Sequence, residues 1–177
     1  MKHIILVGFM GAGKSTMGRL IANKLGCKFI DTDIYIERKE GRSIPDIFAD
    51  DGEAYFRSAE TDALKELLKS DEKHVLALGG GTPLLKENRE LLKASDTYVI
   101  FLKISAKDAY DRLKDDVTRP LLQGTNVKEK IESLLQMRNP VYETIADYVL
   151  VEDDKSLDDI FYELSDVIKT NKKTKFC

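Results

Sequence analysis

The sequence predicts a three-layer α/β/α fold in which one five-stranded parallel sheet lies between helices. Short apolar or β-branched runs alternate along the chain with longer segments of helical periodicity, as in parallel sheets covered by helices. Two of the runs, residues 3–7 and 97–102, are almost wholly apolar, as strands buried on both faces should be. The length of 177 residues corresponds to a single domain, residues 1–177.

The expected elements follow one another in strand–helix order. Phe56, Ala63 and Leu67 recur at helical spacing, which predicts a long helix there. Ser43, with an aspartate three positions later, predicts a helix start, whereas Pro140 predicts a kink or break in a late helix. Strands are expected over residues 3–7, 28–31, 74–78, 97–102 and 148–151. Helices are expected over residues 14–25, 33–40, 43–50, 53–69, 84–93, 106–114, 127–145 and 156–169.

Composition excludes several classes of protein. A hydrophobic fraction of 42% is too high for a disordered chain, and a formal net charge of −3 argues against a basic nucleic-acid binder. The apolar runs are too short to span a bilayer, and Cys27 and Cys177 make neither a disulfide framework nor a metal site. We therefore expect a cytoplasmic protein without a nucleic-acid or membrane partner, and a disordered tail over residues 170–177.

The most informative motif is the run GFMGAGKS at residues 8–15, which fits the pattern G-x-x-x-x-G-K-[ST]. It lies between an apolar strand and an amphipathic helix, so backbone N–H groups and the helix N-terminus would face phosphate oxygens. Lys14 can reach the β- and γ-phosphates of a nucleotide, and Ser15 can bind Mg²⁺. The alternative is an ordinary glycine-rich turn, which the strand–helix context disfavours.

A phosphate loop alone does not name a reaction, because GTPases, ATPases and small-molecule kinases all use it. The sequence shows no guanine-recognition elements. After five strands, little chain remains beyond a lid and an acceptor pocket, which favours a small-molecule kinase.

Charged residues that could bind the molecule accepting the phosphoryl group lie at and after the end of the second strand. Asp31 and Asp33 stand at its carboxyl end, where parallel sheets bind ligands, and could assist Mg²⁺ and hold a hydroxyl group. The alternative is a helix N-cap. Arg57 and Glu60 share a helix face, so the carboxylate could hold the guanidinium toward a ligand, although surface ion pairs of this spacing are common.

Further candidates lie on later loops and helices. Gly79, Gly80 and Gly81 directly follow a strand and would let a ligand approach the backbone. Arg119 stands on a short segment that suits a lid closing over a transferring phosphoryl group. Arg138 lies near the apolar face of its helix and needs an anionic partner, from either the protein or a ligand.

In this order, the motifs resemble the shikimate kinase family over roughly residues 4–151. The resemblance rests on the phosphate loop, Asp31–Asp33, the run from Gly52 through Arg57 to Glu60, the triple glycine, Arg119-Pro120-Leu121-Leu122, and Arg138 with Pro140, Tyr142 and Ala146. It implies a P-loop kinase fold like that of nucleoside monophosphate kinases, with an acceptor-binding segment at about 33–60 and a lid at about 112–125. The implied activity is ATP-dependent phosphorylation of the 3-hydroxyl of shikimate, in aromatic amino-acid biosynthesis; a monomer is expected.

The family's roles are transferred by position. Lys14, Asp33 and Arg119 would be catalytic. Ser15 would ligate Mg²⁺, with Asp31 assisting through water. ATP contacts are expected from Gly11, Ala12, Gly13, Lys14, Ser15, Thr16, Arg112 and Arg119. Shikimate contacts are expected from Asp33, Phe48, Phe56, Arg57, Gly79, Gly80, Gly81 and Arg138, with Ile44 and Leu121 joining the pocket.

Two positions depart from the family's pattern. Thr82-Pro83 follows the triple glycine where an apolar residue is more usual two places on, and residues 152–155 match the adenine-contacting loop poorly. The acidic run over residues 152–166 is expected to be a solvated helix face. The alternatives are a kinase of another hydroxylated acid or of a nucleoside monophosphate, and a non-catalytic relative, which should lack Lys14, Asp33 or Arg119.

Overall fold

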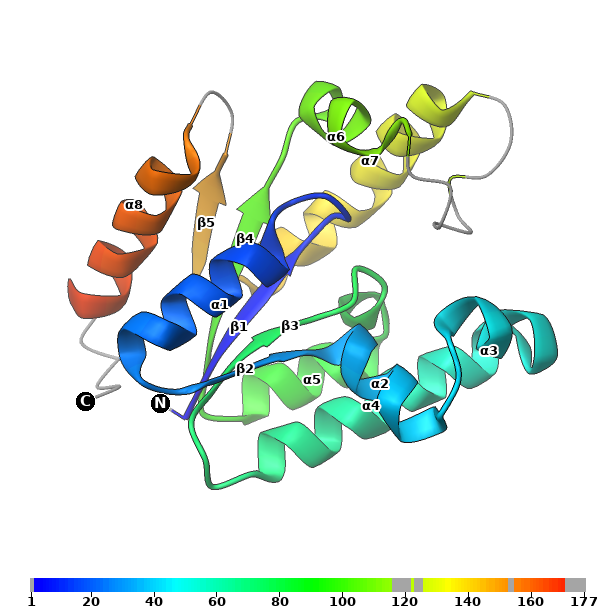
Figure 1. The fold of residues 1–177 in the computed structure, drawn as a ribbon, viewed down its shortest axis with the longest axis horizontal. Helices are drawn as coiled ribbons and strands as arrows, with labels where there is room; N and C mark the ends of the chain where they lie inside the picture. The colour runs from blue at the N-terminus through cyan, green and yellow to red at the C-terminus, as the bar shows by residue number, and fades with distance from the viewer. Residues whose placement is uncertain (1, 116–121, 123–125, 153–154, 171–177) are drawn as a thin grey trace.

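The computed structural model describes residues 2–115, 122, 126–152 and 155–170, and contains one five-stranded parallel sheet (Figure 1). The strand order is β2-β3-β1-β4-β5, so β1 lies at the centre between β3 and β4. The strands are β1 (His3–Gly8), β2 (Lys28–Asp31), β3 (His74–Ala77), β4 (Thr97–Lys103) and β5 (Tyr148–Val151). All five expected strands are confirmed, with ends that differ by at most one residue.

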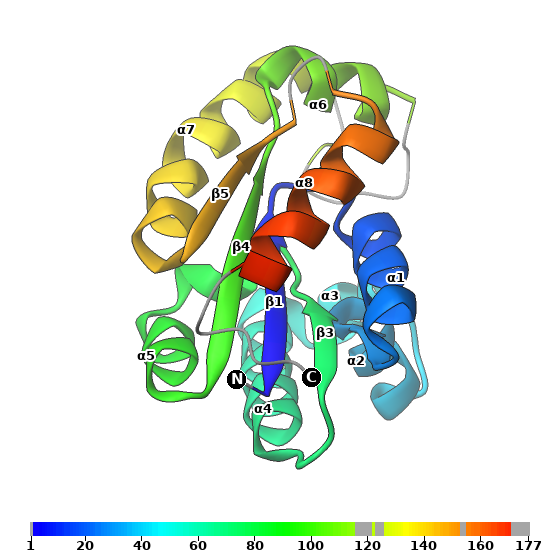
Figure 2. The ribbon, with the colours of Figure 1, turned by 90° about the vertical axis from the view of Figure 1, so that its left-hand side faces the viewer.

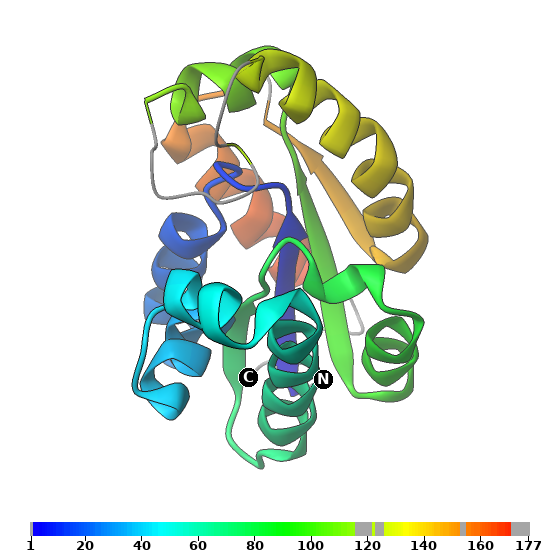
Figure 3. The same ribbon diagram turned by 90° about the vertical axis from the view of Figure 1, so that its right-hand side faces the viewer.

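Helices cover both faces of the sheet, which confirms the three-layer prediction. Alternate residues of β1 enter two separate apolar clusters: Ile4 packs with α1 and α8, and Ile5 packs with α4 and α5. Figures 2 and 3 show these two opposite faces. The helices are α1 (Lys14–Leu25), α2 (Thr32–Glu40), α3 (Ile44–Asp50), α4 (Gly52–Lys69), α5 (Lys86–Ala94), α6 (Ala106–Leu113), α7 (Val127–Ile145) and α8 (Leu157–Thr170).

The structure corrects the start of one expected helix and the effect expected of one proline. A separate 3₁₀ turn, η1 (Thr82–Leu84), precedes α5 in place of one helix from residue 84, and Pro83 occupies its start, where a missing N–H costs nothing. Of the kink or break expected at Pro140, a break is wrong, because α7 continues through this residue to Ile145, the end expected for this helix. The buried side chains of Tyr142 and Ile145 anchor the last turn to the sheet, and such packing stabilises a helix more than local propensity does.

A small third apolar cluster supports the segment between β2 and α4. Ile36, Ile47, Phe56 and Ala63 join α2, α3 and α4 beside the carboxyl end of the sheet. The predicted lid, in contrast, falls largely outside the described residues. Among the described residues, no helix is long and apolar enough to cross a membrane.

Candidate active site

The phosphate loop leads from β1 into α1 as the motif predicts. Gly13 adopts a left-handed conformation, with φ of 66°, immediately before α1 begins at Lys14. Lys14 Nζ donates to the carbonyl oxygens of Gly8 and Phe9, at 2.9 Å each, so the ammonium group lies inside the curve of the loop. A cavity of about 300 Å³ opens above it, lined by Met10 to Thr16, Asp31, Asp33, Leu78, Gly79 and Gly80. We call this the phosphate cavity.

Asp31 caps a helix with one oxygen and contacts Ser15 with the other. Its Oδ1 accepts from the backbone N–H of Asp33 at 3.1 Å, and so caps α2. Its Oδ2 accepts from the hydroxyl of Ser15 at 2.5 Å, at the edge of the phosphate cavity. A hydroxyl and a carboxylate fit Mg²⁺, which takes oxygen ligands and usually keeps several waters. No group of three or more His, Cys, Asp or Glu side chains suited to a metal occurs in the described part of the chain.

A second cavity, of about 540 Å³, lies beside the first and falls in the size range of small-molecule sites. We call it the acceptor cavity. Asp33, Gly79 and Gly80 line both cavities, together with Met10 and Asp31. The lining of the acceptor cavity is completed by Ile34, Glu37, Ser43, Ile44, Pro45, Phe48, Phe56, Arg57, Glu60, Gly81 and Arg138.

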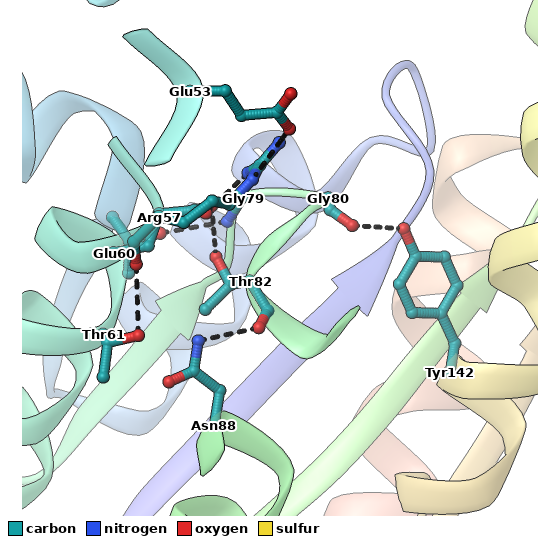
Figure 4. A network of polar contacts seen from close by, with 10 residues as sticks. Glu53, Arg57, Glu60, Thr61, Gly79, Gly80, Thr82, Asn88 and Tyr142 are labelled. Atoms are coloured by element: carbon teal, nitrogen blue, oxygen red, sulfur yellow. Dashed lines mark hydrogen bonds and ion pairs between the residues drawn. The ribbon is translucent and has the colours of Figure 1, made fainter. Parts of the chain in front are cut away.

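Arg57 is held by two carboxylates at the wall of the acceptor cavity (Figure 4). Its Nη1 donates to Glu60 Oε2 at 2.6 Å, and its Nη2 donates to Glu53 Oε1 at 2.8 Å. The Glu60 side chain is only 1% exposed, so this is no ordinary surface ion pair. Burial lowers the pKa of Arg57, but Glu60 and Glu53 raise it by more, so the pKa lies above its usual value and the charge is kept.

The triple glycine packs against the charged groups of the cavity. A methyl group on Gly79 would lie 2.5 Å from Asp33 Oδ1, and one on Gly81 would overlap the Arg57 guanidinium. The hydroxyl of Tyr142 donates to Gly80 O at 2.6 Å and fixes the middle of the loop. Burial raises the pKa of Tyr142 to about 12, so the phenol keeps its proton for this bond.

Arg138 reaches the acceptor cavity from α7. It is 4% exposed, its guanidinium lies 5.9 Å from the ring of Phe9, and its Nε has no hydrogen-bond partner among the described residues. A buried guanidinium whose Nε donor is unused suits an anionic ligand. Phe48 and Phe56, whose ring centroids are 5.1 Å apart, form an apolar wall of the same cavity.

Arg112 lies beside the phosphate loop, where its Nη1 donates to Gly11 O at 2.8 Å and to Glu152 Oε2 at 3.0 Å. Glu152 is 4% exposed, which corrects its assignment to a solvated helix face: it follows β5 and lies before α8 begins. Arg119, Leu121 and Cys177 lie outside the described residues, as do residues 171–177 of the expected tail.

The sequence analysis missed several residues of this region. Met10, Glu37 and Pro45 line the acceptor cavity, and Tyr142 and Thr82 support it from outside. The position of Met10 inside the phosphate loop was a usable signal, because both cavities border that loop. The tertiary contacts of the others leave no local pattern in the sequence.

Comparison with known proteins agrees with this geometry. The shikimate kinase family model matches residues 10–169. A shikimate kinase from Methylococcus capsulatus is 46% identical over 149 residues, covering 84% of this chain and 82% of that protein. Another, from Histophilus somni, is 41% identical over 172 residues, covering 97% of each.

Solved structures show the same relationship. Shikimate kinase from Acinetobacter baumannii, in complex with shikimate, superimposes with a TM-score of 0.91 at 40% identity, covering 97% of this chain and 95% of that chain. Deoxyadenosine kinase from M. mycoides with bound dATP shares the fold alone, with a TM-score of 0.60 at 18% identity over 95% of this chain and 100% of its own. The fold is therefore that of the P-loop kinases, and the chain belongs to the shikimate kinase family.

Proposed function

We propose that this protein transfers the γ-phosphoryl group of ATP to the 3-hydroxyl group of shikimate, giving shikimate 3-phosphate. The observation that carries the proposal is the wall shared by the two cavities, which contains Asp33. A hydroxyl group bound at Asp33 faces the phosphate cavity on one side and the acceptor cavity on the other. Such positioning provides most of the catalysis in phosphoryl transfer.

The acceptor cavity has groups for each part of a hydroxylated ring acid. Arg57 and Arg138 would bind the carboxylate, since planar guanidinium groups form paired hydrogen bonds with it. Asp33 would accept hydrogen bonds from ring hydroxyls and orient or deprotonate the attacking one. Phe48 and Phe56 would contact the apolar part of the ring.

The phosphate cavity would hold the triphosphate of ATP. Its backbone N–H groups and Lys14 would bind the phosphates and stabilise charge on the transferring group, with Arg119 joining from the lid. When bound, Mg²⁺ would neutralise charge on the β- and γ-phosphates, held by Ser15 directly and by Asp31 through water. Arg112 would contact the adenine side of the nucleotide.

The proposal extends to domain organisation, oligomeric state, cellular location and partners. The chain would act as one domain and as a cytoplasmic monomer, with an acceptor segment at about 33–60 and a lid at about 112–125. Neither nucleic acid nor membrane would be a partner.

An assay of ADP release with several acceptors tests the activity. We expect Mg²⁺-dependent turnover with shikimate, and little or none with quinate, gluconate or nucleoside monophosphates. EDTA should abolish turnover and excess Mg²⁺ should restore it. Turnover of a nucleoside monophosphate without turnover of shikimate would overturn the proposal.

A further inference from the structure

A buried chain of hydrogen bonds runs from α5 to the Arg57 guanidinium (Figure 4). Asn88 Nδ2 donates to Thr82 O at 2.8 Å, and Thr82 Oγ1 donates to Glu60 Oε1 at 2.6 Å. Glu60 Oε2 then accepts from Arg57 Nη1 at 2.6 Å. Asn88, Thr82 and Glu60 are 0%, 1% and 2% exposed, so bulk water does not reach these bonds.

Glu60 depends on Thr82 for its orientation. Each of its two oxygens has a partner, the hydroxyl of Thr82 on one and the guanidinium of Arg57 on the other. A buried carboxylate oxygen that loses its donor keeps its desolvation cost, so the group turns or shifts to find another. Any such turn also moves the oxygen that holds Arg57.

The hydroxyl of Thr82 is itself held firmly in place. Thr82 N donates to Gly79 O at 3.1 Å, which ties it to the glycine loop, and Pro83 stiffens the next position. Asn88 binds the carbonyl of Thr82, and Arg89 Nη1 donates to the carbonyls of Pro83 and Leu84 at 2.9 and 2.7 Å. The 3₁₀ turn η1 is therefore fastened to α5 by two consecutive side chains.

We propose that Thr82 is a positioning residue for the acceptor, acting through Glu60 on the direction of the Arg57 guanidinium. This inference rests on the proposed function. It gives a specific role to the Thr82-Pro83 pair, which departs from the family's pattern, because the proline fixes the turn and the hydroxyl fixes the carboxylate. Thr82 is not among the residues that line the acceptor cavity or the phosphate cavity.

Substitution of Thr82 by valine removes the hydroxyl and keeps the shape. Because a hydrogen bond to a charged group is worth about tenfold or more, we expect the KM for shikimate to rise about tenfold. The KM for ATP should stay within about twofold. T82S keeps the donor and should restore the KM for shikimate. T61V is the matched control: Thr61 is 6% exposed and adjoins Glu60, but in the described part of the chain its hydroxyl donates to the backbone oxygen of Arg57, at 3.1 Å, and not to a carboxylate.

A double-mutant cycle separates positioning from general stability. In an R57A background, T82V should have no further effect on the KM for shikimate, because the group on which Thr82 acts is gone. Circular dichroism melting would verify that each variant is folded, and T82A would repeat the test if T82V does not fold.

The outcomes are distinct. A folded T82V enzyme with the wild-type KM for shikimate, or an equal effect of T82V with and without Arg57, overturns the role of Thr82 and leaves the proposed function intact. A wild-type protein that fails to phosphorylate shikimate overturns the proposed function, and this role with it.

Discussion

Substitution of Gly81 by alanine should disable acceptor binding while leaving the fold and the nucleotide site intact. Gly81 has φ of −86°, which alanine adopts freely, so the backbone is not strained. The added methyl group would overlap Nη1 of Arg57 and lie 2.5 Å from Cζ and 2.9 Å from Nη2. Because these atoms end a flexible side chain, the guanidinium moves and the backbone stays.

The size of the effect follows from that distance. To pass from 2.5 Å to the 3.4 Å at which ordinary contact begins, Cζ must retreat by at least 0.9 Å, and Nη1, which lies nearer, must move further. A misplacement of about 1 Å in a positioning group can cost about 10²-fold, or roughly 2.7 kcal/mol. We therefore expect kcat/KM for shikimate to fall about 10²-fold. The free energy of unfolding should change by no more than about 1 kcal/mol, since the lost unfolded-state entropy of glycine offsets part of the cost.

Initial rates of ADP release at saturating ATP, with shikimate varied, would measure the loss, and urea unfolding would measure stability. R57A is the comparator, and the double variant G81A/R57A should be no worse than R57A alone. A KM for shikimate within about twofold of wild type in folded G81A would refute the reasoning. An equal rise in the KM for ATP would do the same.

Three further predictions concern other parts of the molecule. K14A should lower kcat by about 10³-fold or more, measured in the ADP assay, because the ammonium group inside the loop would stabilise the transferring phosphoryl group. D33N should lower kcat by about 10²-fold or more while the Kd for ATP, measured by calorimetry, stays near wild type. Burial lowers the pKa of His3 and His74, whose rings stack 5.6 Å apart, so below about pH 6.5 the unfolded chain binds more protons than the folded one. The free energy of unfolding should therefore fall as pH drops from 7.5 to 5.5, by up to about 1.4 kcal/mol per pH unit for each histidine. Urea unfolding of the double variant H3Q/H74Q at several pH values checks this. A urea midpoint that depends on pH as steeply as that of the wild type would contradict the prediction.

Features fixed by local spacing could be predicted from the sequence. The phosphate loop has its own motif, and strand–helix alternation places Asp31 and Asp33 at the carboxyl edge of the sheet. The spacing of Arg57 and Glu60 predicts that they share a helix face. The sequence could not show that this helix face is buried. Because of that burial, the ion pair forms part of the wall of the acceptor cavity and does not lie on the surface.

Contacts between distant elements could not be predicted in this way. Tyr142 meets Gly80 across 62 positions, and Arg112 meets Glu152 across 40. Glu152 begins an acidic run, and charge patterning alone favours solvent for such a residue. Only the packing of β5 beside β4 brings it to an arginine that also contacts the phosphate loop.

The two arginines of the acceptor cavity are not equivalent in charge. Arg57 is already paired with Glu60 and Glu53, so its positive charge is largely neutralised before a ligand binds. Within the described residues, Arg138 makes no ion pair, although it is almost fully buried.

In the proposed complex, Arg138 would therefore provide the net attraction for a carboxylate, because an uncompensated buried cation gains most from an anion. Arg57 would orient the bound carboxylate, since its guanidinium is held in position by Glu53 and Glu60 on one side and by Gly81 on the other. On this reasoning, a neutral acceptor of the same shape loses its affinity chiefly at Arg138, and a misaligned Arg57 lowers the affinity for shikimate even though its charge is unchanged.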